Sequence, residues 1–219
     1  MTDTPNYELF AFWRTSATYR VRVALNLKGL AAHEHVINLD AGENRNADFL
    51  AINPMGAIPA LVVNGSVPIT QSQAILEFLE EMHPAAPLLP PDLQGRARVR
   101  SLVAMLVADT HPLLTGRIKK YLVGGGHMDD AAFRNWQINW FTVGLHAFEK
   151  RLAMDPATYC HGHAITMADI CLASIIVVMR VFKIEVADIP NITRVMALLD
   201  ANEAFAKAAP LNQVGAPNP

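Results

Sequence analysis

The sequence has few cysteines, no long apolar run and no concentration of basic charge, and each of these absences excludes a class of protein. Cys160 and Cys171 are the only cysteines among 219 residues, too few for a disulfide framework and typical of a reducing compartment. The most apolar stretch, residues 170–179, is well short of the ~20 residues that a membrane-spanning helix needs. The formal net charge is -2 and the 18 basic residues are scattered, which argues against a nucleic-acid partner.

Two further signals are also missing. The first residues, MTDTPNYELF, contain no basic stretch followed by an apolar one, so we expect no secretory signal and a cytoplasmic location. Cys160, His161 and His163 are close together but have no fourth ligand nearby, and Gly162 indicates an ordinary turn. We therefore expect no metal site.

The first third of the chain predicts alternating strands and helices. Residues 7–13 are rich in aromatic side chains and suit a buried strand, whereas residues 16–28 carry apolar side chains at helical spacing until Gly29. Asn64-Gly65 is the dipeptide most typical of a tight hairpin turn. In chain order we expect a strand at 7–13, a helix at 16–28, a strand at 35–39, a helix at 47–52, strands at 59–63 and 66–70, and a helix at 71–82.

A proline-rich segment then separates this α/β part from a helical part. Residues 83–92 hold four prolines, which disfavour both helix and sheet pairing and mark a domain boundary. Thr166 and Asp169 have the spacing of a capping box before an apolar run, so we expect them to hold the start of a buried helix. The expected helices cover residues 93–122, 130–152, 166–182, 191–199 and 203–208. The prediction is an α/β domain at 1–84, a linker at 85–91 and an all-helical domain at 92–219.

The order βαβαββα, the proline-rich linker and the helical second half resemble the soluble glutathione transferases. The stretch RTSATYRVRVALNLKG, residues 14–29, is similar to the first helix of the zeta class. NPMGAIPAL, TQSQAILEFLEE, DTHPLLTGRIKKYL and TMADICL also resemble segments of that class. The resemblance covers nearly the whole chain and implies a thioredoxin-like domain with an all-α second domain. It further implies a glutathione-dependent isomerase of the maleylacetoacetate or maleylpyruvate type, and a homodimer.

The resemblance also implies roles for particular residues. Hydroxyl groups at a helix start can stabilise a thiolate, so Thr15 and Ser16 are the expected catalytic residues, with Thr15 favoured for the thiolate contact. Pro59 would be cis and would present the backbone of Ile58 to glutathione like an added strand. Gln71 and Ser72 open a helix whose N-terminus suits the γ-glutamyl carboxylate. The expected glutathione-binding residues are Thr15, Ser16, Ala17, Asn44, Ile58, Pro59, Gln71, Ser72 and His111, and the expected substrate-binding residues are Arg14, Thr115, Arg117 and Arg180.

The sequence departs from the zeta pattern at three places. Ala17 replaces the motif cysteine, Leu114-Thr115-Gly116 stands where the class commonly has asparagines and a leucine, and Val181 replaces an arginine. Arg180 is adjacent to Val181 but points about 100° away around a helix. Three interpretations remain open: the isomerase, a transferase that conjugates glutathione to another small electrophile, and a non-catalytic binding module on the same fold.

Overall fold

A computed structural model describes residues 5–217, which form two compact units. The first unit comprises the described residues up to Pro87 together with those from Ala201 onward, and the second comprises Leu88–Asp200. The sequence predicts one helical domain over residues 92–219, after the linker. The structure instead groups the last helix, α9 (Glu203–Ala208), with the first unit, because α9 packs against α1 (Ser16–Leu27).

The first unit contains a four-stranded mixed sheet. Its strands are β1 (Tyr7–Ala11), β2 (His33–Val36), β3 (Ala60–Val63) and β4 (Ile69–Thr70). Their order is β2-β1-β3-β4, with β1 parallel to β2 and the other neighbours antiparallel. α1 connects the two parallel strands, as predicted. Asn64 and Gly65 have φ angles of 51° and 70°, so they form the predicted tight turn after β3. The following strand, predicted at 66–70, is shorter and covers only Ile69–Thr70.

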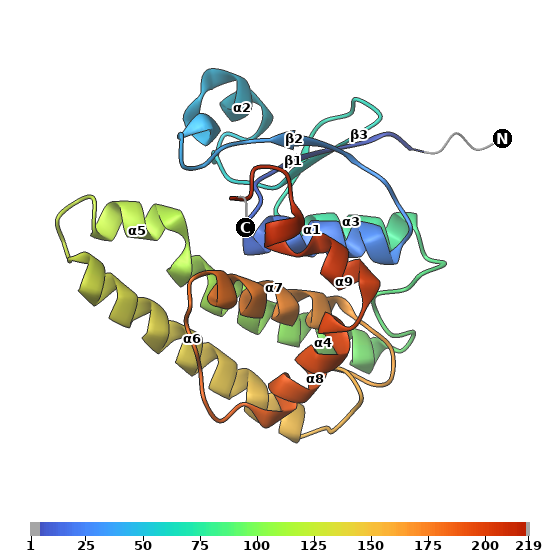
Figure 1. Cartoon of the computed structure of the whole chain (residues 1–219). Helices are drawn as coiled ribbons and strands as arrows, with labels where there is room; N and C mark the ends of the chain where they lie inside the picture. Colours follow the sequence, from blue (N-terminus) through green and yellow to red (C-terminus); the bar gives the residue numbers. More distant parts are fainter. Residues whose placement is uncertain (1–4, 218–219) are drawn as a thin grey trace. The chain divides into compact units, whose positions relative to one another are not determined.

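Helices lie on both faces of this sheet (Figure 1). α1 and α3 (Ser72–Met82) lie against one face, and α2 (Ala47–Ile52) lies beyond the other. The end of α1 is tied to the end of α3 by Lys28, whose ammonium group is fully buried. It donates to the Glu80 carboxylate at 3.1 Å and to the carbonyl oxygens of His83 and Ala86 at 2.9 and 2.7 Å. All three ammonium protons therefore have acceptors, which compensates the desolvation of the charge.

The second strand begins two residues before the predicted range of 35–39. Its register with β1 runs from Glu8 opposite His33 to Ala11 opposite Val36. His35 lies 2.9 Å from the Glu8 carboxylate, and its ring stacks on Phe10 with a centroid distance of 4.7 Å. Pairing with β1 sets the bounds of this strand, whereas the apolar residues Val36, Ile37 and Leu39 suggested a later one.

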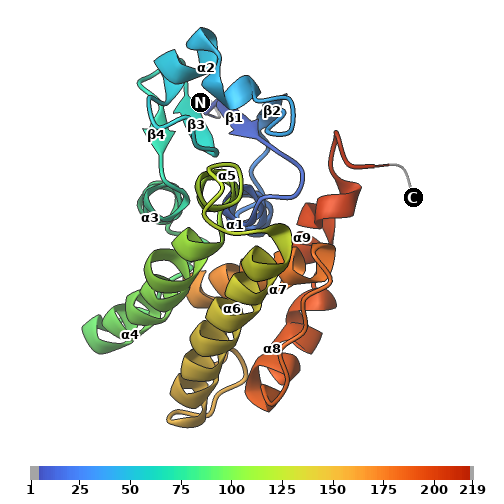
Figure 2. The same ribbon diagram turned by 90° about the vertical axis from the view of Figure 1, so that its left-hand side faces the viewer.

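The second unit is helical, as predicted. Its helices are α4 (Leu93–Ala104), α5 (Gly116–Leu122), α6 (Asp130–Ala153), α7 (Met167–Val181) and α8 (Pro190–Asp200). α7 is buried along most of its length and packs against α4 and α8, while α6 packs against α8 and against Met105–Thr110, the segment that follows α4 (Figure 2). The predicted capping box of Thr166 and Asp169 at the start of α7 is confirmed.

The single helix predicted over residues 93–122 is wrong, because the helix breaks in its middle. Met105–Thr110 forms a π-helical turn, in which the Thr110 hydroxyl donates to the Met105 carbonyl at 2.8 Å, and His111–Leu114 forms a 3-10 turn. Pro112 has no backbone N–H for a helical hydrogen bond, and Thr115 leaves the helix with ψ at 154°. His111 and Thr115 therefore do not share a helical face, contrary to the prediction.

Close packing from α6 accompanies this break. A Cβ atom at Gly144 would lie 2.3 Å from the Thr110 hydroxyl oxygen, so only glycine lets α6 approach the π-helical turn this closely. The tertiary contact thus explains why Gly144 is needed in the interior of a helix.

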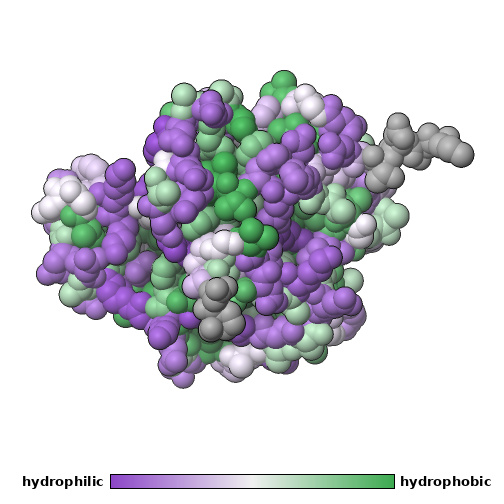
Figure 3. Space-filling view, turned by 45° about the horizontal axis from the view of Figure 1, so that its top comes forward, coloured by the Kyte–Doolittle hydropathy of each residue, from purple (hydrophilic) through white to green (hydrophobic). Residues whose placement is uncertain are grey.

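None of the helices in residues 5–217 combines the length and the apolar character needed to cross a membrane. On the face shown in Figure 3, hydrophilic residues are spread between smaller apolar areas. The exposed large apolar side chains, such as Val67, Leu93 and Val214, come from separate segments of the chain. Isolated apolar side chains of this kind are ordinary on protein surfaces.

Candidate active site

Three segments with predicted site residues meet at one edge of the sheet in the first unit. β1 runs toward Thr15, and its residue Phe10 lies opposite Ala60 at the start of β3. Ala60 in turn lies opposite Thr70, the last residue of β4. The end of β1, the Ile58-Pro59 bond and the start of α3 are therefore neighbours, although they are far apart in the sequence.

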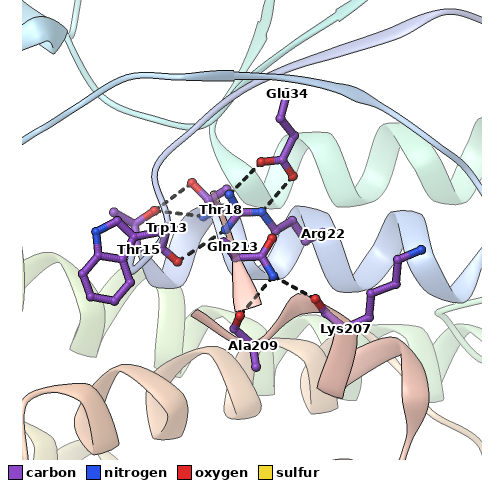
Figure 4. Close-up of polar contacts among 8 residues, drawn as sticks. All are labelled: Trp13, Thr15, Thr18, Arg22, Glu34, Lys207, Ala209 and Gln213. Carbon is purple, nitrogen blue, oxygen red and sulfur yellow. Dashed lines mark hydrogen bonds and ion pairs between the residues drawn. The ribbon is translucent and has the colours of Figure 1, made fainter. Parts of the chain in front are cut away.

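The first of these segments is the N-terminus of α1. Thr15 is the N-cap, and its hydroxyl oxygen accepts the Thr18 backbone N–H at 3.4 Å and lies 2.7 Å from the Thr18 hydroxyl (Figure 4). Ser16, the first helical residue, is buried, and the first turn contains no acidic side chain. The dipole and the first N–H groups of α1 are therefore available to an anion.

A buried arginine fixes the chain just before this helix. Arg22 donates to both oxygens of the Glu34 carboxylate at 2.8 and 2.7 Å, and more weakly to the Trp13 carbonyl at 3.4 Å (Figure 4). From the C-terminal segment, the Gln213 amide donates to the carbonyl oxygens of Lys207 and Ala209 at 2.8 and 3.0 Å. These contacts hold the β1–α1 connection and the turn after α9 in defined conformations.

Arg14 lies in that connection and is held by a carboxylate. Its guanidinium group forms a bidentate ion pair with Asp40, with one hydrogen bond of 2.8 Å. It also lies over the rings of Phe12 and Trp13, 5.3 and 5.4 Å from their centroids. Arg14 was expected to bind the carboxylate of a substrate, and no pattern in the sequence indicated its partner Asp40.

The second segment is the loop that ends at Pro59. The Ile58-Pro59 peptide bond is cis, as the resemblance implied, and the Ile58 backbone makes no hydrogen bond with other described residues. Asn53 and Asn44 hold the loop, because their side-chain amides donate to the carbonyls of Ala57 and Gly56 at 2.6 and 2.7 Å. The Asn44 amide was expected to bind glutathione, and in the structure its N–H group supports this loop.

Gly56 is required in the same loop. Its φ angle is +58°, and an added Cβ would lie 2.7 Å from the Asn44 carbonyl oxygen. Other residues would be strained in this conformation and would also collide with the backbone. The close packing of Asn44 and Arg45 against Gly56 thus sets the path of the chain toward Ile58.

The third segment is the N-terminus of α3. Gln71 has φ at +68° and its side chain makes no capping hydrogen bond, while Ser72 is buried as the first helical residue. The Ser72 hydroxyl oxygen accepts a 3.0 Å hydrogen bond from Arg20, a side chain on α1 that is only 1% exposed. Sequence reasoning missed Arg20, because its partner is distant in the sequence.

The remaining candidates lie in the second unit. His111 begins the 3-10 turn, and Thr115 is the N-cap residue of α5, with its hydroxyl donating to the Pro112 carbonyl at 3.2 Å. Arg117 is exposed on α5. Arg180 pairs with both oxygens of the Asp200 carboxylate at 2.9 Å, so one carboxylate already occupies its guanidinium.

The site edge of the first unit offers three kinds of binding group. The N-terminus of α1 suits a thiolate, the Ile58 backbone suits an extended peptide, and the N-terminus of α3 suits a carboxylate. A peptide that contains a thiol and a free carboxylate would match all three.

Comparisons with known proteins identify the same fold. Residues 16–82 match the family described as glutathione S-transferase, N-terminal domain. A maleylpyruvate isomerase from a Ralstonia species is 38% identical over 208 residues, covering 94% of this chain and 98% of that protein.

Solved structures agree with this match. The maleylacetoacetate isomerase from Methylobacterium extorquens AM1, solved with bound malonate and GSH, is 41% identical with a TM-score of 0.93, covering 96% of this chain and all of that chain. A maleyl pyruvate isomerase described as a bacterial zeta-class glutathione-S-transferase is 37% identical, with a TM-score of 0.92 and the same coverage. The chain therefore belongs to the glutathione S-transferase family, and within it is similar to the zeta-class maleylacetoacetate and maleylpyruvate isomerases.

Proposed function

We propose that this protein is a glutathione-dependent isomerase of the maleylacetoacetate or maleylpyruvate type. The observation that carries the proposal is the meeting of two helix N-termini without acidic residues in their first turns and a cis-proline loop at one sheet edge. Glutathione matches this arrangement, because it combines a thiol, a peptide backbone and the γ-glutamyl carboxylate. Similar proteins have been solved with GSH, which supports the same ligand.

In the proposed complex each part of glutathione has its own binding groups. Thr15 and Ser16 would stabilise the thiolate, the Ile58 backbone would bind the cysteinyl part, and Gln71 and Ser72 would receive the γ-glutamyl carboxylate. Ala17 and Pro59 would shape the walls, and Asn44 would act by holding the loop. His111 remains a proposed glutathione-binding residue.

The proposed reaction begins when the glutathione thiolate adds to the cis double bond of the substrate. A carbon–sulfur bond forms, and the electron pair of the double bond moves onto the conjugated carbonyl oxygen as an enolate. The former double bond is now single and rotates. The enolate then re-forms the carbonyl and expels the thiolate, which gives the trans isomer and regenerates glutathione without any oxidant.

Arginines would hold the substrate carboxylates through bidentate contacts. Arg14 lies directly before Thr15 and would have to exchange its partner Asp40 for substrate. Arg117 is exposed, whereas Arg180 would have to exchange Asp200 for substrate. The malonate in the Methylobacterium structure is a small dicarboxylate, which is consistent with such a substrate class.

A second candidate function is conjugation of glutathione to another small electrophile. It is favoured by Ala17 and Val181, which replace the motif cysteine and an arginine of the zeta pattern. Both functions use the same thiolate, so the substrate pocket distinguishes them.

The test compares isomerisation of maleylacetoacetate and maleylpyruvate with conjugation of a halogenated aromatic and a haloacid, all at the same glutathione concentration. We expect glutathione-dependent isomerisation to be the fastest reaction. Thr15→Val and Ser16→Ala should be assayed in parallel, and loss of the thiolate contact should lower kcat/KM about 100-fold in the more important of the two. Conjugation without isomerisation would instead favour the transferase.

We also propose that the protein is a cytoplasmic homodimer. Zeta-class resemblance supports the dimer, and two buried cysteines that form no disulfide suit a reducing compartment. Light scattering coupled to size-exclusion chromatography should give twice the chain mass of 24.0 kDa. A mass equal to one chain would contradict the dimer.

A further inference from the structure

Arg20 is a fully buried charged side chain on α1 that none of the steps above uses. It is only 1% exposed and is the largest of the fully buried side chains. It lies four residues after Ser16, so it follows the candidate thiolate site on the same side of α1. Its Nη1 atom donates to the Ser72 hydroxyl oxygen at 3.0 Å, at the first residue of α3. One buried guanidinium therefore connects the two helix N-termini of the site.

The direction of this hydrogen bond determines what Ser72 can do. Arginine has donors and no acceptor, so the Ser72 oxygen must accept from Arg20. The hydroxyl hydrogen of Ser72 is then directed elsewhere, and within residues 5–217 it donates to no other group. Ser72 is itself buried, at 5% exposure, and an unused buried donor is unfavourable unless a ligand accepts from it.

The positive charge of Arg20 also favours an anionic ligand at the start of α3. The first turn of α3 contains no acidic side chain, and the Gln71 side chain makes no capping hydrogen bond. The positive end of the helix dipole and a guanidinium one hydrogen bond away therefore favour the same anionic group. Gln71, with φ at +68°, directs the backbone into α3 in a conformation that few residues adopt.

We propose that Arg20 is a positioning residue that orients the Ser72 hydroxyl to donate to the α-carboxylate of the γ-glutamyl group. This inference rests on the proposed function, because it assumes that glutathione binds in the first unit. The buried pair Arg20 and Ser72 then selects that carboxylate together with the N-terminus of α3. Arg20 itself does not touch the ligand.

The test measures by calorimetry the dissociation constants of two peptides, glutathione and an analogue with 4-aminobutyryl in place of the γ-glutamyl group. The analogue lacks only the α-carboxylate. The ratio of the two constants reports the carboxylate preference, which a purely structural role of Arg20 would leave unchanged. We expect Arg20→Met to lower this preference about tenfold, as expected for a lost hydrogen bond to a charged group.

A double-mutant cycle sharpens the measurement. Ser72→Ala should lower the preference by a similar factor, and the double variant should be no worse than either single variant, because the two side chains act as one unit. Arg20→Lys keeps a positive charge and a donor, so it should retain most of the preference. Arg22→Met is the matched control: it removes another buried arginine of α1, and it should weaken both peptides by the same factor.

The inference is overturned if Arg20→Met weakens both peptides equally, as the control does. Should that variant fail to fold by circular dichroism, Ser72→Ala and Ser72→Thr still decide the question, because only threonine keeps a hydroxyl for Arg20 to orient. An unchanged preference in Ser72→Ala would overturn the inference while leaving glutathione binding intact. If the unaltered protein binds neither peptide, the proposed function fails and the inference with it.

Discussion

α1 begins with Thr15-Ser16-Ala17-Thr18 and α7 begins with Thr166-Met167-Ala168-Asp169, so both helices have a threonine N-cap. In α7 the residue three positions later is a carboxylate, which accepts from the backbone N–H of Thr166 and of Cys160, both at 2.8 Å. In α1 the same position holds Thr18, which carries no charge. The start of α7 is therefore capped by a carboxylate of its own helix, whereas the start of α1 has no such carboxylate and can receive an anion.

This difference teaches how to distinguish a structural helix N-terminus from a functional one. At α7 the orphan N–H groups and the dipole are satisfied inside the protein, and Asp169 is fully buried. At α1 and α3 the first turns contain no acidic side chain, which suits an external thiolate and an external carboxylate. Two starts with similar sequence patterns thus differ in whether a carboxylate of the same helix satisfies them.

The largest expected effect comes from removing the Asp169 carboxylate that caps the start of α7. Asp169→Ala should lower the free energy of unfolding by about 3 kcal/mol or more, because three buried donors lose a charged acceptor. Urea denaturation measures the change. The control is Asp129→Ala at the exposed N-cap of α6, where about 1 kcal/mol is expected, and equal losses in both variants would contradict the comparison.

Adding a carboxylate to the first turn of α1 should abolish the proposed stabilisation of a thiolate there. Thr18→Asp would create at α1 the capping box that α7 has, and its carboxylate would repel a bound thiolate. We expect the pKa of bound glutathione to rise by about 1 unit or more, measured from thiolate absorbance against pH. Thr18→Val, which removes the hydroxyl without adding charge, is the control, and an unchanged thiol pKa in Thr18→Asp would refute the role of this terminus.

The Cys160 thiol, next to the Asp169 carboxylate at the start of α7, should differ from the glutathione thiol: its protonated form should be favoured. Burial, and then the Asp169 carboxylate, raises the pKa of the Cys160 thiol well above its ordinary value. A raised pKa means that the folded state favours the protonated thiol, so the stability it contributes is present below the unfolded pKa of about 8.5 and is lost at higher pH.

We therefore expect the free energy of unfolding to fall above about pH 8.5, by at most about 1.4 kcal/mol per pH unit from this group. Burial also raises the pKa of Tyr7, which adds a further loss above about pH 10. Cys160→Ala should flatten the first part of the curve, as measured by urea denaturation at each pH. Rapid alkylation of Cys160 in the folded protein at pH 7 would contradict this account.

The smallest expected effect concerns the ion pair of Arg14 and Asp40, just before the start of α1. Asp40 and Arg14 form a partly exposed pair, so Asp40→Asn should change the free energy of unfolding by under about 1 kcal/mol. The variant frees the guanidinium, and we expect the KM of a dicarboxylate substrate to fall about twofold to fivefold. A rise in KM would indicate instead that Asp40 orients Arg14 for substrate.

The sequence by itself determined the features that depend on neighbouring residues. The Asn64-Gly65 turn, the capping box of Thr166 and Asp169, and the succession of strands and helices all follow from short spacings and local conformational preferences. Thr15 and Ser16 could be placed at a helix start for the same reason.

Only the tertiary structure decided the features that join distant segments. Arg20 and Ser72 are 52 positions apart, and the supports of Ile58 come from Asn44 and Asn53 through side-chain contacts that no periodic pattern encodes. The approach of Gly144 to Thr110 and the packing of α9 against α1, which groups α9 with the first unit, are likewise contacts between distant segments. Local spacing thus predicts which helices form and how they start, whereas contacts across the fold decide which unit a helix joins and which buried charges lie beside the candidate site.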